Sequence, residues 1–237
     1  MNILSIDYGE KRIGFAIGDT ERKIPNPLQV IQNNSIPFII DEIKKIVISY
    51  NVEKIVRKQV VMETLKIIKI GGNIIDDQIA LEGFLNAFSK IKGKKILVHG
   101  GGKLATQLAA QMNVPVKMID GRRITDAATL EIITMVYAGK INKNMIAKLQ
   151  AYQCNSIGFT GADGNSIVSE KRPVNTIDFG FVGDVVTVHT QTVDVLLKGN
   201  VTPVFCAITH DEKGQLLNTN ADTIASELAI GFAKNYK

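Results

Sequence analysis

The feature that most constrains the fold is an apolar run ending in glycines, which occurs twice in succession. Residues 65–72 read LKIIKIGG, and residues 95–103 read KILVHGGGK. Each strand-like run reaches a glycine turn, and helical periodicity follows over 77–91 and 102–112. Strands that alternate with helices pair in parallel through crossover connections. The pattern predicts an α/β fold, a three-layer sandwich with a mainly parallel central sheet.

The other segments are assigned from the same signals. After residue 112 we expect a helix from Thr125 or Asp126 to Tyr152 that Gly139 interrupts, a strand at 155–159, hairpins within 166–188, a helix at 190–198, a strand at 201–206 and a last helix from Asn220. Before residue 57 we expect strands at 2–6 and 12–17, a proline-bearing loop at 24–29, a helix at 36–50 and a strand at 52–56.

The composition is that of an ordinary globular protein. Of the 237 residues, 45% are hydrophobic and 22% charged, and the formal net charge of +5 is spread along the chain. Nucleic-acid binding is therefore not required, and a solvated mixed surface is favoured. No run resembles a signal peptide or reaches membrane-spanning length. With two cysteines, Cys154 and Cys206, we predict buried thiols in a reducing cytoplasm.

The two glycine turns predict an anion site. Glycine amides at a helix start lie at the positive end of the helix dipole and can approach a ligand closely. Gly71 and Gly72 follow one predicted strand, and Gly100 to Gly102 follow the next. Turns at the carboxyl ends of neighbouring parallel strands face one crevice. The alternative is a tight strand-to-helix connection without a ligand, since neither a Walker loop nor GxGxxG is present.

Charged and polar residues near these turns suggest phosphoryl chemistry. Lys69 lies two residues before the glycines, where its ammonium would reach the crevice, although a strand lysine can also extend to solvent. Arg122 and Arg123 suit carboxylate binding, or a salt bridge at a helix end. Asn220 can cap the last helix, whereas Asp222 could orient lysines of a phosphoryl site. No metal-ligand spacing occurs.

Several motifs in order carry a family resemblance. IIKIGGN, ILVHGGGK, GRRITD, MVYAGKINK, IGFTGADGN, FVGDV and LLNTNADTIAS together resemble the acetylglutamate kinases of the amino acid kinase family, over residues 62–237. The resemblance implies the amino acid kinase fold in the cytoplasm and an enzyme of arginine biosynthesis. It would phosphorylate the γ-carboxylate of N-acetyl-L-glutamate, or a related N-acyl-glutamate, with ATP and Mg²⁺. It also implies a homodimer.

The resemblance assigns roles to residues of this chain. Lys69 matches the transition-state lysine of the first strand, and Asp222 matches the aspartate that organises the catalytic lysines. The expected substrate contacts are Gly71, Gly72, Gly101, Gly102, Arg123 on the α-carboxylate, and Asn218. The glycine turn would then face the acceptor carboxylate and the transferred phosphoryl group.

Two departures from the family are expected to matter. The family continues beyond the position of Lys237 into a nucleotide-binding part with a second catalytic lysine, so the fold is expected to be incomplete and the activity impaired. Residues 1–56 instead resemble the N-terminal half of the pre-16S rRNA nuclease family, also described as Holliday junction resolvase-like, with an RNase H-like fold. We expect a hairpin-plus-helix segment there, too small to bury a core alone, joined through 57–61 to the kinase part.

Three functions therefore remain open. The first is an acylglutamate kinase, and the second is a fragment that binds an acyl-amino acid without catalysis. The third is a nucleic-acid enzyme that uses Asp7, which matches the first metal-binding carboxylate of the nuclease family. Because one aspartate cannot hold two cations, a structural role for Asp7 in a hairpin turn is favoured over the third.

Overall fold

The structure is a computed structural model that describes residues 1–20, 25–58, 63–119 and 122–237. It divides into two compact units, Met1–Val61 and Met62–Lys237. Most of the expected junction at 57–61, the expected start at Met62 and Gly121 of the GRRITD motif lie outside the described residues.

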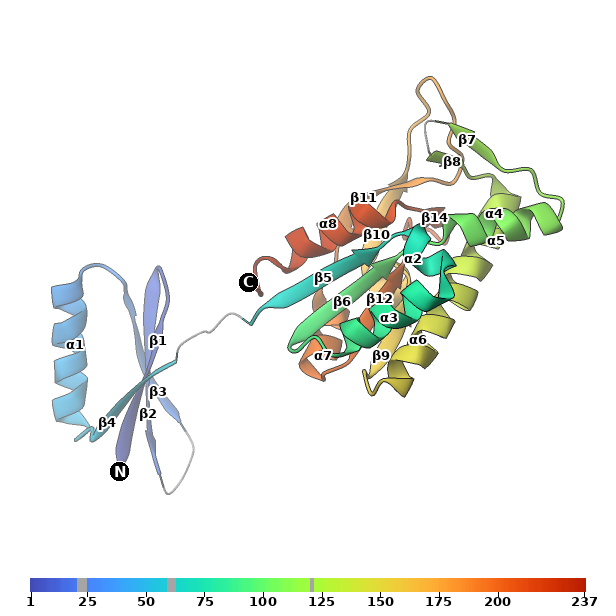
Figure 1. Ribbon diagram of the computed structural model, residues 1–237. Helices are drawn as coiled ribbons and strands as arrows, with labels where there is room; N and C mark the ends of the chain where they lie inside the picture. The colour runs from blue at the N-terminus through green and yellow to red at the C-terminus, as the bar shows by residue number, and fades with distance from the viewer. Residues whose placement is uncertain (21–24, 59–62, 120–121) are drawn as a thin grey trace. The chain divides into compact units, whose positions relative to one another are not determined.

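The first unit is a four-stranded sheet with one helix (Figure 1). Its elements in chain order are β1 (Asn2–Tyr8), β2 (Arg12–Asp19), β3 (Asn26–Gln32), α1 (Ile36–Ser49) and β4 (Lys54–Lys58). The sheet order is β3-β2-β1-β4, with β4 parallel to β1 and the other pairs antiparallel. The strand expected at 52–56 corresponds to β4, so β3 is the strand that the expectation did not include.

The proline-bearing segment expected as a loop forms most of β3. Pro27 lies opposite Ala16 on β2, next to a register shift between Phe15 and Ala16. Proline lacks an N–H donor, and an edge strand next to a bulge tolerates that loss. Antiparallel pairing with β2 therefore makes this segment a strand, although its prolines locally favour a turn.

The first unit also has a hydrophobic core of its own, contrary to expectation. Alternate residues of β1 and β2 point to one face and pack against α1. The buried side chains of this cluster are Leu4, Ile6, Ile13, Phe15, Ile39 and Ile46. Leu4 and Ile13 have no exposed surface. Period-two burial on two paired strands, covered by one amphipathic helix, is enough to build a small core.

The second unit is built on a parallel sheet, as the repeated strand, turn and helix pattern predicts. The sheet order is β5-β6-β12-β9, and each neighbouring pair is parallel. The strands are β5 (Leu65–Ile70), β6 (Lys94–His99), β9 (Ser156–Phe159) and β12 (Thr202–Cys206). β6 and β12 lie at the centre and are buried almost throughout, which explains their continuous apolar runs.

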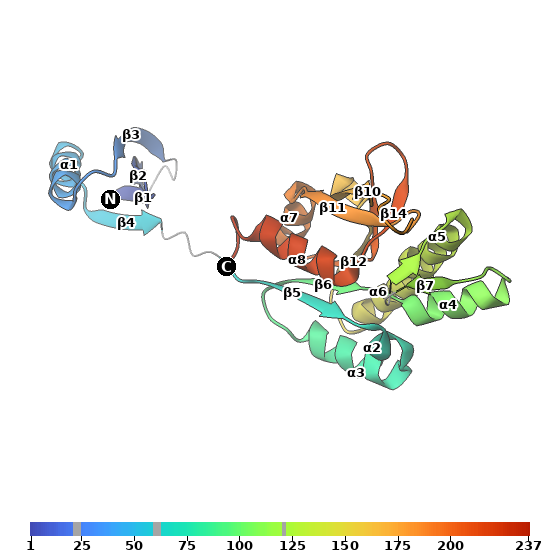
Figure 2. The same cartoon turned by 90° about the horizontal axis from the view of Figure 1, so that it is seen from above.

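Helices cover both faces of this sheet (Figure 2). α7 (Gln191–Lys198) and α8 (Ala221–Phe232) lie on one side, and α8 contacts β5 and β6. The helices α2 (Gly72–Asp76), α3 (Gln78–Ser89) and α6 (Asn142–Ala151) lie on the other. These layers form the expected sandwich. None of the helices in the described part of the chain combines the length and apolarity of a membrane span.

The remaining helices and a second sheet surround the carboxyl ends of the parallel strands. The helical elements are α4 (Gly102–Gln111), α5 (Ala127–Thr134), the π-helix η1 (Met135–Ile141) and the 3₁₀ turn η2 (Asp163–Asn165). The strands are β10 (Ile167–Lys171), β11 (Gly183–Val188), β13 (Ile208–His210) and β14 (Leu216–Asn218), in the order β11-β10-β13-β14, with a separate hairpin of β7 (Lys117–Ile119) and β8 (Arg122–Ile124).

One local feature differs from the sequence-based expectation. Gly139 does not interrupt the helix that begins after Asp126, because the chain passes through η1 directly into α6. Arg122 and Arg123 lie on the short strand β8, which precedes the start of α5. The helix itself begins at Ala127, where the Asp126 side chain accepts a hydrogen bond from the Thr129 amide at 2.8 Å.

Candidate functional site

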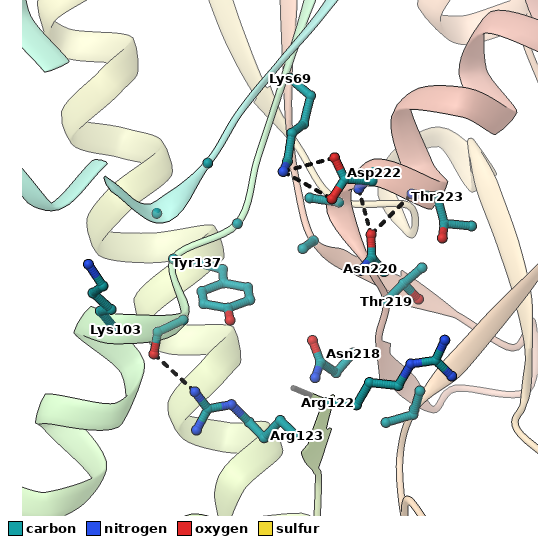
Figure 3. Close-up of a pocket in the computed structure, with 18 of the residues that line it drawn as sticks. Lys69, Lys103, Arg122, Arg123, Tyr137, Asn218, Thr219, Asn220, Asp222 and Thr223 are labelled. Carbon is teal, nitrogen blue, oxygen red and sulfur yellow. Dashed lines mark hydrogen bonds and ion pairs between the residues drawn. The ribbon is translucent and has the colours of Figure 1, made fainter. Parts of the chain in front are cut away.

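A pocket of about 510 Å³ lies at the carboxyl ends of β5 and β6 (Figure 3). Four segments far apart in the sequence meet there: the end of β5, the triple-glycine turn before α4, strand β8 and the junction of β14 with α8. All eight residues singled out from the sequence line it: Lys69, Gly71, Gly72, Gly101, Gly102, Arg123, Asn218 and Asp222. The two glycine turns therefore face one crevice.

Lys69 and Asp222 form an ion pair across the pocket. The Lys69 Nζ lies 2.8 Å from Oδ1 and 3.0 Å from Oδ2 of Asp222. Asp222 is in the first turn of α8, where the helix dipole favours a carboxylate. The ammonium at the end of β5 thus points into the pocket, as Figure 3 shows, toward the start of α8.

Asn220 has the capping role that its position suggested. Its Oδ1 accepts hydrogen bonds from the amides of Asp222, at 2.7 Å, and Thr223, at 3.2 Å. This cap satisfies amides at the start of α8 that have no partner within the helix. It also fixes the backbone that carries Asp222 opposite Lys69.

The triple-glycine turn leaves the start of α4 open toward the pocket. Gly101 is the N-cap residue, and no side chain of the described residues caps this helix. A Cβ on Gly101 would lie 2.2 Å from Cδ1 of Ile141 and 3.1 Å from the Tyr137 ring, so only glycine fits. The first amides of α4 have no partners within the helix and are available to an anion.

Arg123 is held beside this turn. Its Nη2 donates to the carbonyl oxygen of Gly102 at 3.0 Å and to Oγ1 of Thr106 at 2.8 Å. Within the described residues neither Arg122 nor Arg123 forms an ion pair, so the helix-end salt bridge considered above is absent there. A fixed guanidinium without a carboxylate partner suits a carboxylate ligand.

Asn218 connects the pocket floor to the segment that precedes α5. Its Nδ2 donates to Oγ1 of Thr125 at 3.0 Å, and its amide donates to the carbonyl of Phe181 at 2.9 Å. Thr125 is fully buried and pairs with the backbone of Phe179 and Phe181. Asn218 is thus held in place from both its side chain and its backbone.

Several lining residues were not found from the sequence. Arg172 lies in the segment between β10 and β11 and lines the pocket. Its Nε lies 3.1 and 3.2 Å from the two carboxylate oxygens of Asp184, and its guanidinium contacts the Phe179 ring. This hydrogen-bonded pair lowers the pKa of Asp184. Tyr137 lines the pocket from η1, and burial raises the pKa of its phenol. Arg172 itself lies outside the motifs quoted above, and its position depends on long-range strand register.

The described residues contain no group of three or more His, Cys, Asp or Glu side chains that could hold a metal ion. Of the described residues that line the pocket, Asp222 is the one carboxylate. In the first unit, Asp7 is an exposed residue of β1, opposite Gly14 on β2.

Comparison with known proteins decides the family. The profile described as "Amino acid kinase family" matches residues 64–235, which is most of the chain. The chain belongs to the amino acid kinase family. A second profile, described as "Holliday junction resolvase", matches residues 1–57. The family resemblance drawn from the motifs is thereby confirmed.

Two curated relatives of this amino acid kinase family chain are acetylglutamate kinases. The one from Cytophaga hutchinsonii is 58% identical over 170 residues, covering 71% of this chain and 64% of the relative. The one from Parabacteroides distasonis is 51% identical over 176 residues, covering 74% and 69%. The chain therefore spans about two thirds of the length of the curated relatives that it matches.

Solved structures support the amino acid kinase fold. The protein smu.665 from Streptococcus mutans UA159 superposes with a TM-score of 0.60 at 24% identity, covering 71% of this chain and 69% of that one. N-acetylglutamate synthase from Neisseria gonorrhoeae, in complex with coenzyme A and N-acetyl-glutamate, gives 0.60 at 18% identity, covering 84% and 43%. At these identities the likeness shows the fold.

Proposed function

We propose that residues 62–237 bind N-acetyl-L-glutamate or a related N-acyl-glutamate and act in ATP-dependent phosphorylation of its γ-carboxylate. The observation that supports this most directly is the convergence of Lys69, the open start of α4 and Arg123 on one pocket. An acyl-glutamate has two carboxylates, and this pocket offers a distinct cationic or amide group for each. Relatives named acetylglutamate kinase agree with the proposal.

The roles that the family resemblance implies are compatible with this geometry. Arg123, fixed by Gly102 and Thr106, would bind the α-carboxylate, and Asn218 would bind polar atoms of the acyl-amino acid. The amides of Gly101 and Gly102 would face the γ-carboxylate as one of its oxygens bonds to the terminal phosphorus of ATP. ADP leaves as the bond from that phosphorus to its bridging oxygen breaks, and the product is an acyl phosphate.

Lys69 would stabilise charge on the transferred phosphoryl group. Such transfer depends mainly on positioning and on positive charge near the phosphoryl oxygens. Asp222 holds the Lys69 ammonium at 2.8 Å and thereby orients it. Gly71 and Gly72, at the start of α2, would add backbone amides on the other side of that group.

Mg²⁺ would accompany the nucleotide. With Asp222 as the one carboxylate among the described lining residues, and that carboxylate engaged by Lys69, the pocket has no ligand set of its own for a metal. Mg²⁺ commonly binds through substrate phosphates and water, with few protein ligands. Its chemistry would be to neutralise charge on the phosphates.

The proposal is tested with the full chain, N-acetyl-L-glutamate and ATP. We expect the acid to raise the melting temperature, as any ligand of the native state does, and ADP release to require both compounds. We also propose that this release is slow, because about a third of the relatives' length has no counterpart in the match. Stabilisation without ADP release would favour the acyl-amino-acid binding fragment instead, and no response to the acid would reject both.

The match of residues 1–57 to the resolvase profile gives a second activity to test. Cleavage of structured RNA or branched DNA that is lost in Asp7→Asn would support a nuclease. We expect no such cleavage, because Asp7 has no cluster of further carboxylates among the described residues. The homodimer implied by the family stays a prediction, and light scattering after size exclusion measures it.

A further inference from the structure

His99 is a fully buried polar residue that the proposed reaction does not use. It ends β6, directly before the triple-glycine turn, and has no exposed surface. Its Nδ1 lies 2.8 Å from the carbonyl oxygen of Gly100, and its Nε2 lies 3.0 Å from Nδ2 of Asn142. Both ring nitrogens therefore have partners, at the base of the turn that lines the pocket.

The two partners fix the protonation of the ring. The carbonyl of Gly100 can only accept, so Nδ1 must carry the proton. The amide group of Asn142 also lies 2.9 Å from the carbonyl of Val204, which identifies the Asn142 atom as the NH₂ nitrogen. That group donates to Val204 and to His99 Nε2, which accepts as a neutral ring. Burial lowers the pKa of His99 to about 4, so the ring stays neutral at physiological pH.

Asn142 is itself held tightly. It is 1% exposed and is the first residue of α6, directly after η1. Gly158 on β9 leaves room for it, since a Cβ there would lie 1.8 Å from Asn142 Oδ1. The preceding residue, Ile141, packs against Gly101. The same stretch of helix therefore contacts the glycine turn directly through Ile141 and indirectly through Asn142 and His99.

The consequence lies in the peptide plane between Gly100 and Gly101. A trans peptide is planar, and its C=O and N–H point in opposite directions. When His99 holds the Gly100 carbonyl toward the buried side, the N–H of Gly101 must point the opposite way, toward the pocket that Gly101 lines. The His99 ring thus sets the direction of an amide that would face the acceptor carboxylate.

We propose that His99 and Asn142 are a positioning pair, in which the neutral His99 ring orients the Gly101 amide and Asn142 fixes the ring. The inference rests on the proposed function for the identity of the ligand, but the geometry of the turn can be tested without it. Neither residue touches the pocket, so the pair acts through the backbone of the turn.

Two substitutions of His99 separate positioning from packing. In His99→Asn, the amide nitrogen replaces Nδ1 and can still donate to the Gly100 carbonyl, while the bond to Asn142 is lost. In His99→Gln, the longer side chain can still meet Asn142, while the bond to Gly100 is lost. We expect both variants to melt at a lower temperature. His99→Gln alone should lose about tenfold in affinity for N-acetyl-L-glutamate, the effect of one misaligned buried hydrogen bond.

Ser156→Ala is the matched control. Ser156 is a buried residue of β9 whose hydroxyl donates to the Cys154 carbonyl at 2.7 Å, away from the glycine turn. Its loss should lower the melting temperature without changing the affinity measured by titration calorimetry. Equal affinity in both His99 variants, or a loss of affinity that follows the melting temperature across all three variants, would overturn the proposal.

Nuclear magnetic resonance tests the pair without a ligand. In the unchanged protein, the ¹⁵N shifts of His99 should show a protonated Nδ1 and an unprotonated Nε2, with no titration between about pH 5.5 and 9 given its lowered pKa. The opposite tautomer, or titration in that range, rejects the pair even if neither variant folds.

If N-acetyl-L-glutamate does not bind the unchanged protein, the proposed function fails. An exchange rate of the Gly101 amide that changes in His99→Gln but not in His99→Asn would still support the pair, and equal exchange would reject it.

Discussion

The two units of this chain each contain a residue for which the sequence motifs predict a family's catalytic position, and the surroundings of these residues differ. Asp7 of the first unit is an exposed residue of β1, in a part of the structure where the described residues contain no cluster of carboxylates. Lys69 of the second unit lies 2.8 Å from Asp222, 153 positions away in the sequence, in a pocket where segments far apart in the sequence meet. A sequence match at a catalytic position therefore supports a catalytic role only where the fold places interacting side chains from distant segments beside that residue.

The two units also differ in the size of their hydrophobic cores. The first buries a cluster centred on Leu4, Ile13 and Phe15 under one helix. The second buries a parallel sheet between two layers of helices, with Leu97, Val98, Val204 and Phe205 fully inaccessible. A domain of about 60 residues buries a smaller fraction of its surface than one of about 150 residues and is therefore marginally stable.

The largest effect we predict tests whether the two cores are independent. Phe205→Ala, in β12, should lower the free energy of unfolding of the second unit by about 3–5 kcal/mol because it leaves a cavity in a fully buried site. Phe15→Ala, in β2, should unfold the smaller unit and leave binding of N-acetyl-L-glutamate intact. Hydrogen exchange read by mass spectrometry resolves the units separately. Faster exchange across 63–237 in Phe15→Ala would show that the larger unit depends on the smaller one.

The next effect compares the two matched residues directly. Lys69→Ala should reduce ATP- and acetylglutamate-dependent ADP release about a thousandfold, or by about 4 kcal/mol of transition-state stabilisation, because a positioned cation is lost. Asp7→Asn should leave it unchanged. Lys66→Ala is the matched control, since Lys66 lies on the same strand and donates to the Lys92 carbonyl at 3.1 Å. Activity that persists in Lys69→Ala would remove Lys69 from the site.

Much of the second unit was predictable because local signals and tertiary structure agree there. The expected strand at 65–70 matches β5, and the helix expected after the triple glycine is α4. In these segments the residue propensities, the glycine turn and the hydrophobic periodicity all predict the same structure, a strand followed by a turn and a helix. Lys69 and the glycines that line the pocket follow from that topology, since the carboxyl ends of neighbouring parallel strands meet at one edge.

What the sequence did not reveal depends on long-range fit. Gly139 reads locally as a helix interruption, yet the chain stays helical in η1, where Tyr137 and Ile141 pack against Gly101. Arg172 reaches the pocket because the register of β10 on β11 brings Asp184 to its guanidinium. Pro27 lies in a strand because β2 pairs with it. In each case the deciding contact involves a residue that no local window includes.

Two strand glycines give a smaller contrast between the units. Gly158→Ala, in β9, should destabilise by about 1–3 kcal/mol, because its Cβ would lie 1.8 Å from Oδ1 and 2.9 Å from Cγ of an Asn142 side chain held by hydrogen bonds. Gly14→Ala, in β2, should be close to neutral, since its Cβ would meet Asp7 Cβ at 3.8 Å, an ordinary contact. Urea denaturation measures both. Equal stability of the two variants would contradict the packing around Asn142.

The smallest effect compares two helix N-caps. Asp126 accepts a hydrogen bond from the Thr129 amide at the start of α5, whereas Ser35 makes no side-chain cap at the start of α1. Asp126→Ala should therefore cost about 1 kcal/mol near neutral pH, and Ser35→Ala much less. The hydrogen bonds from Thr129 lower the pKa of Asp126 below its ordinary 3.8.

This lowered pKa gives the sign of the pH dependence. A group whose folded-state pKa is depressed contributes its full stability above the unfolded value, and the contribution is lost as the pH falls through the folded value. The stability gap between Asp126→Ala and the unchanged protein should thus be constant from about pH 5 upward and should shrink in stronger acid. The Ser35→Ala difference should not vary with pH. Urea titrations of both variants at several pH values measure this, and a gap for Asp126→Ala that widens in acid would show that its carboxylate does not cap α5.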